Sequence, residues 1–446
     1  MRYIPHSDDE IKHMLDSLGV DSVAELFKKI PNSLRLDRSL KIAPGQSELE
    51  LLNDMEILSE ENLNNWHLGC FLGAGAYSHF IPSAVDAIAS RSEFYTAYTP
   101  YQPEISQGTL QTIFEWQTMM CGLTGCEVTN ASMYDGASAA AEAALMAIRI
   151  TGRKRVGLSR ALHPNYRQVV ETYLSGLDVE IFLIDLDKGT TSSIEICDKN
   201  TACVLIQQPN FLGGIEPLEE IAMTLHKSGT LLVACVNEAL SLAFLKAPGS
   251  LGADIVCGDA QSFGVPINFG GPHLGFLSTR KEHVRQIPGR LVGQTVDGRG
   301  LRGFVLTLST REQHIRRERA TSNICTNQGL CLLMATVYLA LHGKEGLREL
   351  AQRNYQLARY ARERVKESDR LSLKFEGPSF NEFVIETQES VEEVTERCLA
   401  AFVLPGLSLS EYYPELGSCL LVCVTELSDK QGIDRWLALL EGRNDK

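Results

Sequence analysis

A short turn of glycine and small polar residues opens an alanine-rich stretch and could bind an anion. It reads Tyr134-Asp135-Gly136-Ala137-Ser138, and small residues continue to about Ile150 before Gly152. Glycine permits a tight turn, and the free N–H groups and the dipole at a helix N-terminus attract negative charge. The alternative is a simple glycine turn, with Ser138 near the cap and alanines for close contact with a sheet. The stretch alone favours that alternative.

The order of polar residues along the whole chain changes this interpretation. Enzymes of the aspartate-aminotransferase type, which use pyridoxal phosphate (PLP), carry a phosphate-binding helix N-terminus and then a side chain that stacks on the ring. A polar residue, an acid for the pyridine nitrogen and a lysine follow. The corresponding succession here is Gly136-Ala137-Ser138, His163, Gln208 to Asn210, Asn237-Glu238 and Gln261. The sequence therefore resembles this class of PLP enzyme.

Two of these positions lack, or can lack, the group that PLP chemistry requires. A Schiff base requires a primary amine, which the amide of Gln261 cannot supply, and no lysine occurs between Lys246 and Lys281. At the acid position either Asn237 or Glu238 could face the pocket, and an asparagine would hold a pyridinium less well than a carboxylate would. We expect no catalytic residue in this chain. The vestigial cofactor pocket is predicted to consist of Gly136, Ala137, Ser138, His163, Asn237, Glu238 and Gln261.

Near-continuous apolar strands that alternate with helical patterns must position these residues. This alternation is typical of a mostly parallel sheet covered on both faces. The predicted strands are 155–159, 179–184, 202–206, 231–236, 254–257 and 274–278. We therefore predict an α/β large domain of the PLP-transferase type (fold type I) over residues 61–328.

The two ends of the chain have different patterns. Residues 1–60 are predicted to form a helical arm, with capping boxes at Ser7–Glu10 and Ser22–Glu25. Residues 329–446 are predicted to form a small α+β domain that begins with two helices, 329–342 and 345–368. Its remaining predicted elements are strands 371–375, 382–386 and 419–424 and helices 391–402 and 429–442.

Composition excludes several classes of function. A formal charge of −14 argues against binding to nucleic acid or to anionic membranes. No apolar run approaches a bilayer-spanning length, and the N-terminus lacks the apolar stretch of a signal peptide, so we expect a soluble cytoplasmic protein. The twelve cysteines lack a C-x-x-C spacing, which predicts reduced, mostly buried thiols and no metal site.

Three further segments have an unusual composition. Leu72 to Tyr77 is glycine-rich, but it lacks the context of a dinucleotide-binding motif and is interpreted as a turn. The segment 95–107, hereafter the tyrosine loop, carries three tyrosines between prolines and suits either a pocket or interface or a packed surface loop. The basic stretch before Thr321 could hold a carboxylate or phosphate, although a solvated face is the commoner explanation.

The same segments carry a resemblance to one family over essentially the whole chain. The motifs are Phe71 to Tyr77, Tyr98 to Gly108, Asn130-Ala131-Ser132, Gly270 to Gly275, and Arg311 to Arg317 running into Thr321 to Gln328. They are similar to those of subunit 1 (alpha) of the two-subunit glycine dehydrogenases (decarboxylating), the P-proteins of the glycine cleavage system.

This resemblance implies an α2β2 assembly in which subunit 2 (beta) carries PLP on its own lysine and this chain binds no cofactor. Glycine would lose CO2, and its aminomethyl group would pass to the lipoyl arm of the H-protein. This chain would then line the partner's pocket and present surface to the H-protein. The candidates for the interface or substrate pocket are Tyr98, Tyr101, Gln107, Asn323 and Thr326.

Two other hypotheses on the function of the chain remain open at this point. A self-sufficient PLP enzyme would need Lys246 or Lys281 as its Schiff-base lysine, and both lie away from the expected position. A structural or regulatory scaffold would contain no active-site residue at all.

Overall fold

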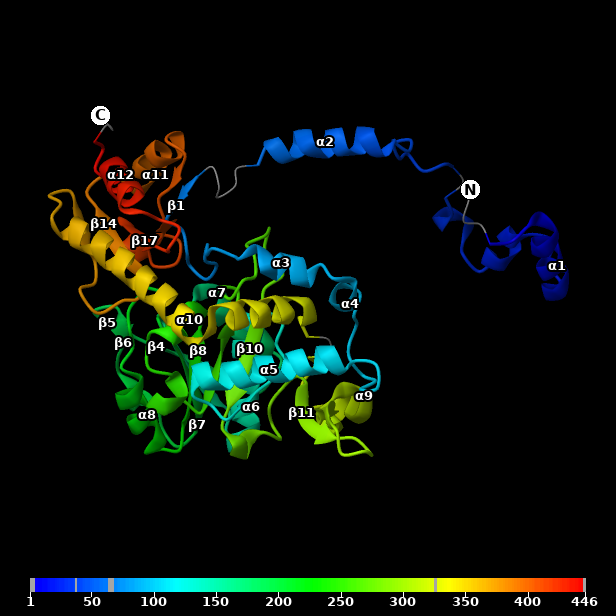
Figure 1. Ribbon diagram of the computed structural model, residues 1–446, viewed down its shortest axis with the longest axis horizontal. Helices are drawn as coiled ribbons and strands as arrows, with labels where there is room; N and C mark the ends of the chain where they lie inside the picture. The colour runs from blue at the N-terminus through cyan, green and yellow to red at the C-terminus, as the bar shows by residue number, and fades with distance from the viewer. Residues whose placement is uncertain (1–4, 37, 63–67, 325–326, 444–446) are drawn as a thin grey trace. The chain divides into compact units, whose positions relative to one another are not determined.

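The computed structural model describes residues 5–36, 38–62, 68–324 and 327–443 of the 446-residue chain. The chain divides into two compact units, residues 1–63 and 64–446 (Figure 1).

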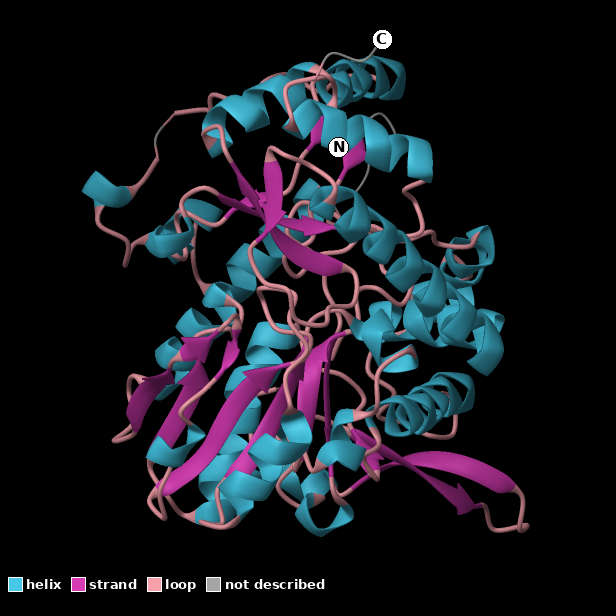
Figure 2. Cartoon of the chain, turned by 90° about the vertical axis from the view of Figure 1, so that its left-hand side faces the viewer, coloured by secondary structure: helices cyan, strands magenta, loops and turns pink. Residues whose placement is uncertain are grey.

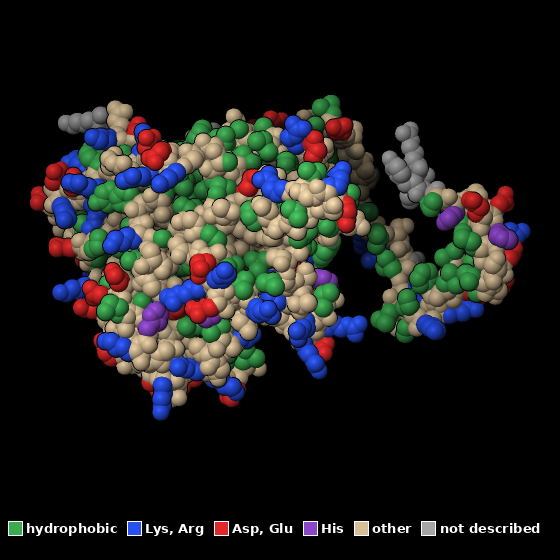
Figure 3. Space-filling view, turned by 60° about the horizontal axis from the view of Figure 1, so that its bottom comes forward, with side chains coloured by type: hydrophobic (Ala, Val, Ile, Leu, Met, Phe, Trp, Pro, Cys, Tyr) green, Lys and Arg blue, Asp and Glu red, His purple; other side chains and the backbone are tan. Residues whose placement is uncertain are grey.

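The N-terminal unit is helical and has almost no interior of its own. It contains α1 (Asp8–Leu18), α2 (Glu48–Glu60) and two short 3-10 turns. Ser7 and Glu10 form the predicted capping box, and Ser47 forms a second with Glu50. The box predicted at Ser22 is wrong, because a 3-10 turn without a side-chain cap begins there. Neither helix buries a residue, and Figure 3 shows hydrophobic side chains exposed along this unit.

A seven-stranded sheet organises the second unit, in the order β2-β10-β9-β8-β7-β3-β4. Only β10 runs antiparallel to the other strands. The strands are β2 (Val128–Thr129), β3 (Arg155–Ser159), β4 (Glu180–Ile184), β7 (Thr201–Gln207), β8 (Leu231–Val236), β9 (Ile255–Asp259) and β10 (Gly275–Thr279). The mostly parallel sheet that the apolar runs predict is therefore present.

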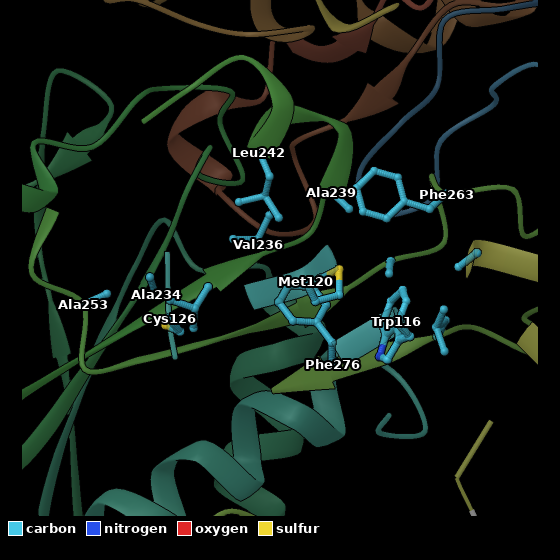
Figure 4. Close-up of a cluster of buried hydrophobic side chains, with 14 of the residues drawn as sticks. Trp116, Met120, Cys126, Ala234, Val236, Ala239, Leu242, Ala253, Phe263 and Phe276 are labelled. Carbon is cyan, nitrogen blue, oxygen red and sulfur yellow. The ribbon is translucent and has the colours of Figure 1, made fainter. Parts of the chain in front are cut away.

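Helices cover both faces of this sheet because its central strands are apolar on both sides (Figure 2). One face packs against α5 (Gln107–Thr124), α8 (Leu218–His226) and the first half of α10 (Gly329–Lys366). The other face packs against α6 (Gly136–Thr151) and α7 (Pro164–Leu174). In the first layer Trp116 and Met120 lie near Phe276 of β10 (Figure 4).

Smaller elements complete this region. They are α3 (Ser83–Ala89), α4 (Ser92–Tyr95), α9 (Gln313–Arg316), the two-stranded sheet β5 (Leu186–Asp187) with β6 (Thr190–Thr191), and the hairpin β11 (Leu291–Val296) with β12 (Arg302–Thr307). The hairpin has no counterpart among the predicted elements.

A second, four-stranded antiparallel sheet forms near the C-terminus, in the order β13-β14-β17-β16. Its elements are β13 (Leu371–Leu373), β14 (Glu382–Thr387), β16 (Leu407–Ser408) and β17 (Cys419–Cys423), with α11 (Val391–Ala400) and α12 (Lys430–Leu440) packed on one face. Separately, β1 (Gly69–Cys70) pairs in parallel with β15 (Val403–Leu404). This pairing ties the start of the second unit to its C-terminal region.

Helix α10 belongs to both cores and turns at Gly343, whose backbone leaves the helical region at φ 59°, ψ −174°. The prediction of two helices with a break between 342 and 345 is thus confirmed. Among the described residues α10 alone is long and apolar enough to cross a membrane, and 44% of its apolar window is buried. Leu332, Ala335 and Tyr338 pack in the large core and Ala361 in the smaller one, as expected of a core helix.

Every cysteine that the structure describes is a free thiol, and most are buried. Within the same residues no group of His, Cys, Asp and Glu side chains is arranged to hold a metal ion.

Candidate functional site

The predicted anion site at the start of α6 is filled by side chains of the protein. Asp135 caps the helix, with its Oδ1 accepting from the Ser138 N–H at 2.7 Å. The first N–H of the helix, from Gly136, donates to Oδ2 of Asp259 at 3.0 Å. A Cβ atom at Gly136 would lie 1.9 Å from the hydroxyl of Tyr166, so this hydroxyl fills the space beside the turn.

His163, the predicted ring-stacking residue, contacts the protein's own backbone. Its Nδ1 caps α7 by accepting from the Asn165 N–H at 3.1 Å, so Nε2 carries the proton and donates to the Ala74 carbonyl at 2.9 Å. Burial lowers the pKa of His163, which favours this neutral form. A Cβ at Gly75 would lie 3.0 Å from Nε2 of His163. Gly75 therefore packs against the imidazole ring.

Gln261, at the lysine position, is bonded to the same backbone segment. Its Oε1 accepts from the Tyr77 N–H at 2.9 Å, and its Nε2 donates to the Tyr77 carbonyl at 3.1 Å and to the Val265 carbonyl at 2.7 Å. The side chain is 4% exposed. All polar valences of this amide except one lone pair are therefore used within the protein.

The structure separates the two candidates for the acid. Asn237 faces the pocket, since a Cβ at Gly75 would lie 3.8 Å from its Nδ2. Both polar atoms of Asn237 are buried without a hydrogen-bond partner among the residues that the structure describes. Glu238 instead pairs with His79 at 3.1 Å and accepts from Asn381 at 3.0 Å. Neither of these two candidates thus directs a carboxylate at the position of a pyridine nitrogen.

The pairing of Glu238 is part of a buried cluster around His79, whose ring also lies 2.8 Å from Glu426. Burial alone would lower the pKa of His79, but the two carboxylates outweigh it and raise the pKa to about 10. Burial raises the pKa of Glu426, yet its bonds to His79, Phe80 and Asn354 bring it down to about 2. The cluster is therefore a charged imidazolium held between two carboxylates, and it fixes the chain just after Tyr77.

Asn210, the predicted polar residue, is used by its own turn. Its Oδ1 accepts from the N–H groups of Leu212 and Gly214, and its Nδ2 donates to Glu216 and to the Gly189 carbonyl. Gln208 accepts from the Glu216 N–H in the same turn. Asn210 therefore has no free group to offer to a ring hydroxyl, whereas Gln208 uses only its Oε1 in this turn.

These residues do not fit PLP. The lysine position lacks an amine, and a carboxylate stands where a phosphate dianion would need N–H donors. The ring position is taken by the backbone of Ala74 and Gly75.

The tyrosine loop differs from the pocket in the exposure of its side chains. Its aromatic rings are exposed, and they lie above a buried arginine. Tyr98 is 75% and Tyr101 is 47% exposed. The Tyr101 hydroxyl accepts from Nη2 of Arg290 at 2.8 Å, and the guanidinium lies 5.1 Å from the ring centroid. Arg290 is buried and is balanced by Glu312 at 3.4 Å.

The other interface candidates have different surroundings. Gln107 begins α5 and bonds both the N–H and the carbonyl of Phe304, which holds β12 against the helix. Asn323 is exposed, and Thr326 lies outside the described residues. Asn327 accepts weakly from Arg290 at 3.3 Å, so this segment does approach the base of the tyrosine loop.

A cavity of about 180 Å³ lies under the same loop. Its walls include Phe94, Tyr98, Ile113, Asn327 and Leu333, and most of its exposed lining is apolar. The structure therefore brings Tyr98, Tyr101 and Asn327 to one region, whereas Gln107 lies at the edge of β12.

Several residues with clear roles here are absent from the predicted site. They are Asp259, Tyr166, His79, Glu426 and Glu382, whose carboxylate accepts from the Tyr77 hydroxyl at 2.8 Å. The position of Asp259, two residues before Gln261, was the only local signal. The others come from distant parts of the chain, and no spacing rule connects them.

A family model and the sequences of known relatives indicate the same protein family. The model of the glycine cleavage system P-protein matches residues 1–440. The probable glycine dehydrogenase (decarboxylating) subunit 1 of Desulforamulus reducens is 52% identical, with 99% of each chain covered. The protein of the same description from Desulfitobacterium hafniense is 53% identical over 98% of this chain and 99% of its own.

Solved structures agree with this result. A glycine decarboxylase (P-protein) of the glycine cleavage system, in inhibitor-bound form, superposes with a TM-score of 0.90 at 42% identity, covering 99% of this chain and all of the other. A sphingosine-1-phosphate lyase from Burkholderia pseudomallei superposes with a TM-score of 0.64 at 14% identity, covering 91% of this chain and 92% of its own. This second likeness shows the fold alone, and it confirms the predicted α/β class and fold type I.

Proposed function

We propose that this chain is the subunit that does not carry the cofactor. The premise is that the chain belongs to the glycine cleavage system P-proteins, in their subunit 1 branch. The glycine decarboxylase would then be complete only with subunit 2, which bears PLP on its own lysine. PLP supplies the electron sink for loss of CO2 from glycine. The residues of this chain would shape and close the partner's pocket.

The proposal depends on one observation, the burial and hydrogen bonding of the Gln261 side chain. Its amide is buried, and three of its hydrogen bonds go to backbone groups of Tyr77 and Val265. A residue held in this way has a structural role and cannot form a Schiff base.

The two lysines of the self-sufficient alternative have unsuitable surroundings. Both are exposed. Lys281 follows β10, which runs antiparallel to β9 with Thr279 opposite Ile255. Gln261 follows the other end of β9, so a strand of roughly 15 Å separates the two positions. This separation supports a cofactor on another polypeptide.

The proposed contribution of this chain is the tyrosine loop. Tyrosine offers a large, rigid surface with a polar end, which suits a pocket wall that must exclude water. Arg290 and Glu312 hold Tyr101 from below, while Tyr98 projects outward. In the proposal Tyr98 and Tyr101 face the partner's substrate, and Asn323 and Thr326 reach across the interface. Gln107 positions β12 next to this loop.

The wider assembly is part of the same proposal. We infer an α2β2 heterotetramer in the cytoplasm that transfers the aminomethyl group of glycine to the lipoyl arm of the H-protein. Within this chain residues 1–60 form an arm, 61–328 the large domain and 329–446 the small domain. The separate cores on the two sheets support a large and a small domain, and the first half of α10 packs in the large core.

The test is to express this chain with and without subunit 2. Absorbance near the PLP band and exchange of CO2 into glycine are measured for each subunit alone and for the mixture. The proposal predicts a colourless subunit 1, a yellow subunit 2 and exchange only in the mixture. A yellow subunit 1 that borohydride converts to a covalent adduct would contradict it.

A pure scaffold is the remaining alternative, and point variants distinguish it. If this chain only holds the assembly together, substitutions in the tyrosine loop change the amount of complex and leave turnover per complex unaltered. The proposal requires turnover itself to fall.

A further inference from the structure

We propose that this chain occupies the cofactor position of its own fold with parts of itself: the Asp259 carboxylate replaces the phosphate, the segment Gly73–Tyr77 (hereafter the closing segment) replaces the ring, and Gln261 replaces the lysine. Loss of the lysine alone explains why no Schiff base forms. In our proposal the pocket is, in addition, closed to phosphorylated ligands even when an amine is supplied.

The Asp259 carboxylate has the donor set that a bound phosphate would need. It accepts from the N–H groups of Gly136 at 3.0 Å, Gln261 at 2.9 Å and Leu274 at 3.4 Å. Nδ1 of His273 lies 3.3 Å from the same carboxylate, and Asp259 is 2% exposed. A carboxylate at a helix N-terminus is stabilised by the same N–H groups and dipole that bind phosphate. A second anion brought there would meet like charge at contact distance.

The space for a phosphate is also taken. A Cβ on Gly136 would lie 1.9 Å from the Tyr166 hydroxyl and 2.9 Å from the backbone N of Asp259. Tyr166 is 8% exposed and its ring lies 5.2 Å from that of His163. The phenol therefore extends across the turn that would otherwise form the phosphate cup.

The closing segment is held on three sides. The Ala74 N–H donates to Oε1 of Glu382 at 2.7 Å, and the Ala74 carbonyl accepts from His163. Tyr77 is bonded through its backbone to Gln261 and through its hydroxyl to Oε2 of Glu382 at 2.8 Å. These partners are the N-cap residue of α7, the turn after β9, and the start of β14. A ligand entering this position would have to break all of these bonds.

Two glycines allow the segment to pass so close. Gly75 has φ +102° and packs on the His163 ring, so any side chain there would be strained and would displace the imidazole. A Cβ at Gly73 would lie 2.5 Å from the Glu382 carboxylate and 2.7 Å from Cβ of Cys423. The glycine-rich sequence is therefore required by close packing, with no nucleotide involved.

The first experiment restores the amine. Gln261→Lys is assembled with subunit 2, treated with PLP and cyanoborohydride, and mapped by peptide mass spectrometry. We expect an adduct on the partner's lysine and none on the peptide spanning residues 254–280. An adduct at position 261 in more than a few per cent of the chains would overturn the proposal.

The second experiment removes the internal anion and does not depend on the fate of the first variant. Asp259→Ala, Asp259→Asn and wild type are melted in the complex with 20 mM phosphate and with chloride at equal ionic strength. We expect Asp259→Ala to melt lower than wild type and to gain about 2 °C specifically from phosphate. Asp259→Asn should gain less, and wild type nothing.

The controls make every outcome decisive. Tyr173→Ala, an exposed tyrosine on α7, should behave as wild type in both buffers. A phosphate-specific gain in wild type equal to that in Asp259→Ala would mean that the site is open. No gain in Asp259→Ala, nor in Asp259→Ala combined with Tyr166→Phe to remove the hydroxyl beside Gly136, would mean that the carboxylate does not replace an anion. An Asp259→Ala chain that folds only in phosphate supports the proposal, and one that folds in neither buffer counts against it.

Discussion

The vestigial pocket and the tyrosine loop differ in where their polar groups find partners. In the pocket, Gln261 and His163 are bonded to the backbone of the closing segment, and Asp259 accepts from three N–H groups. In the tyrosine loop, Arg290 is buried and Glu312 half-buried beneath, while the aromatic rings stay at the surface. In the first region these three side chains find their partners within one chain, and only Asn237 keeps two buried polar atoms without a described partner. The second presents groups that a partner can use, and our proposal assigns function to it for this reason.

The comparison predicts that the two regions respond to substitution in different ways. Changes in the pocket should reduce stability, and changes in the loop should reduce turnover of the assembled enzyme.

The largest expected effect is on stability, from Gln261→Ala. The variant loses three buried hydrogen bonds and leaves the Tyr77 and Val265 backbone groups unpaired, so we expect a loss of about 3 kcal/mol in free energy of unfolding. Urea denaturation measures the loss, and hydrogen exchange should show faster exchange of the closing segment. Gln168→Ala, at an exposed position of α7, is the matched control and should change stability by less than about 0.5 kcal/mol.

The next effect is a pH dependence from the buried imidazolium. A folded pKa raised to about 10 means that the stabilisation by His79 is complete below about pH 6.5 and is lost as the pH rises through about 10. Burial raises the pKa of Glu382 to about 7, so stability also falls as the pH rises from about 4.5 to 7. Between pH 7 and 9 the His79 contribution should fall by about 2 kcal/mol.

Thermal melting of wild type and His79→Gln from pH 5 to 10 tests this assignment. The variant should be less stable at pH 6 and should have a flatter profile above pH 7. Parallel profiles for the two proteins would assign the alkaline loss to other groups.

For Tyr98→Ala in the complex with subunit 2 we expect a smaller change in the free energy of unfolding. The main effect of this variant should be on turnover. Removal of an exposed ring should leave the free energy of unfolding within about 0.5 kcal/mol of wild type. Exchange of CO2 into glycine should fall about tenfold, because water enters and the pocket wall is lost. Tyr173→Ala is the control for removing an exposed tyrosine elsewhere, and equal exchange rates for both variants would reject the role of Tyr98.

The smallest effect is expected for Tyr101→Phe, which keeps the ring and removes only the acceptor for Arg290. We expect a loss of about 1 kcal/mol in stability and a two- to threefold lower exchange rate, since the loop is less firmly held. Tyr101→Ala should lower the rate further. A phenylalanine variant as impaired as the alanine variant would show that the hydrogen bond matters and the ring does not.

The fold could be predicted well where periodicity is local. The predicted strand 155–159 coincides with β3, and the alanine-rich helix ends at Gly152 as its left-handed cap requires. The hairpin of β11 and β12 was missed because its strands are largely solvated and lack continuous apolar runs. The cap at Ser22 was wrong because a sequence match to a capping box does not supply the helix that must follow.

The pocket could be predicted only in outline. Order along the chain brought His163, Asn237 and Gln261 into one region, since each follows a strand or its turn at the same edge of the sheet. The closing segment could not be foreseen, because its partners lie 89 residues away at His163, 184 at Gln261 and 308 at Glu382. A turn at Leu72 to Tyr77 accounts for the glycines of this segment but does not predict which residues they approach.

The pairing of β1 with β15 has a consequence for biosynthesis. Gly69 and Cys70 emerge early from the ribosome, whereas Val403 and Leu404, like Glu426 beside His79, emerge near the end. At roughly 5–20 residues per second, translation of the intervening chain takes on the order of 20–70 s. During that interval residues 69–80 have His163 and Gln261 as partners but lack β15, Glu382 and Glu426. We therefore expect the closing segment to be fully bonded late in maturation, once the C-terminal strands have been released.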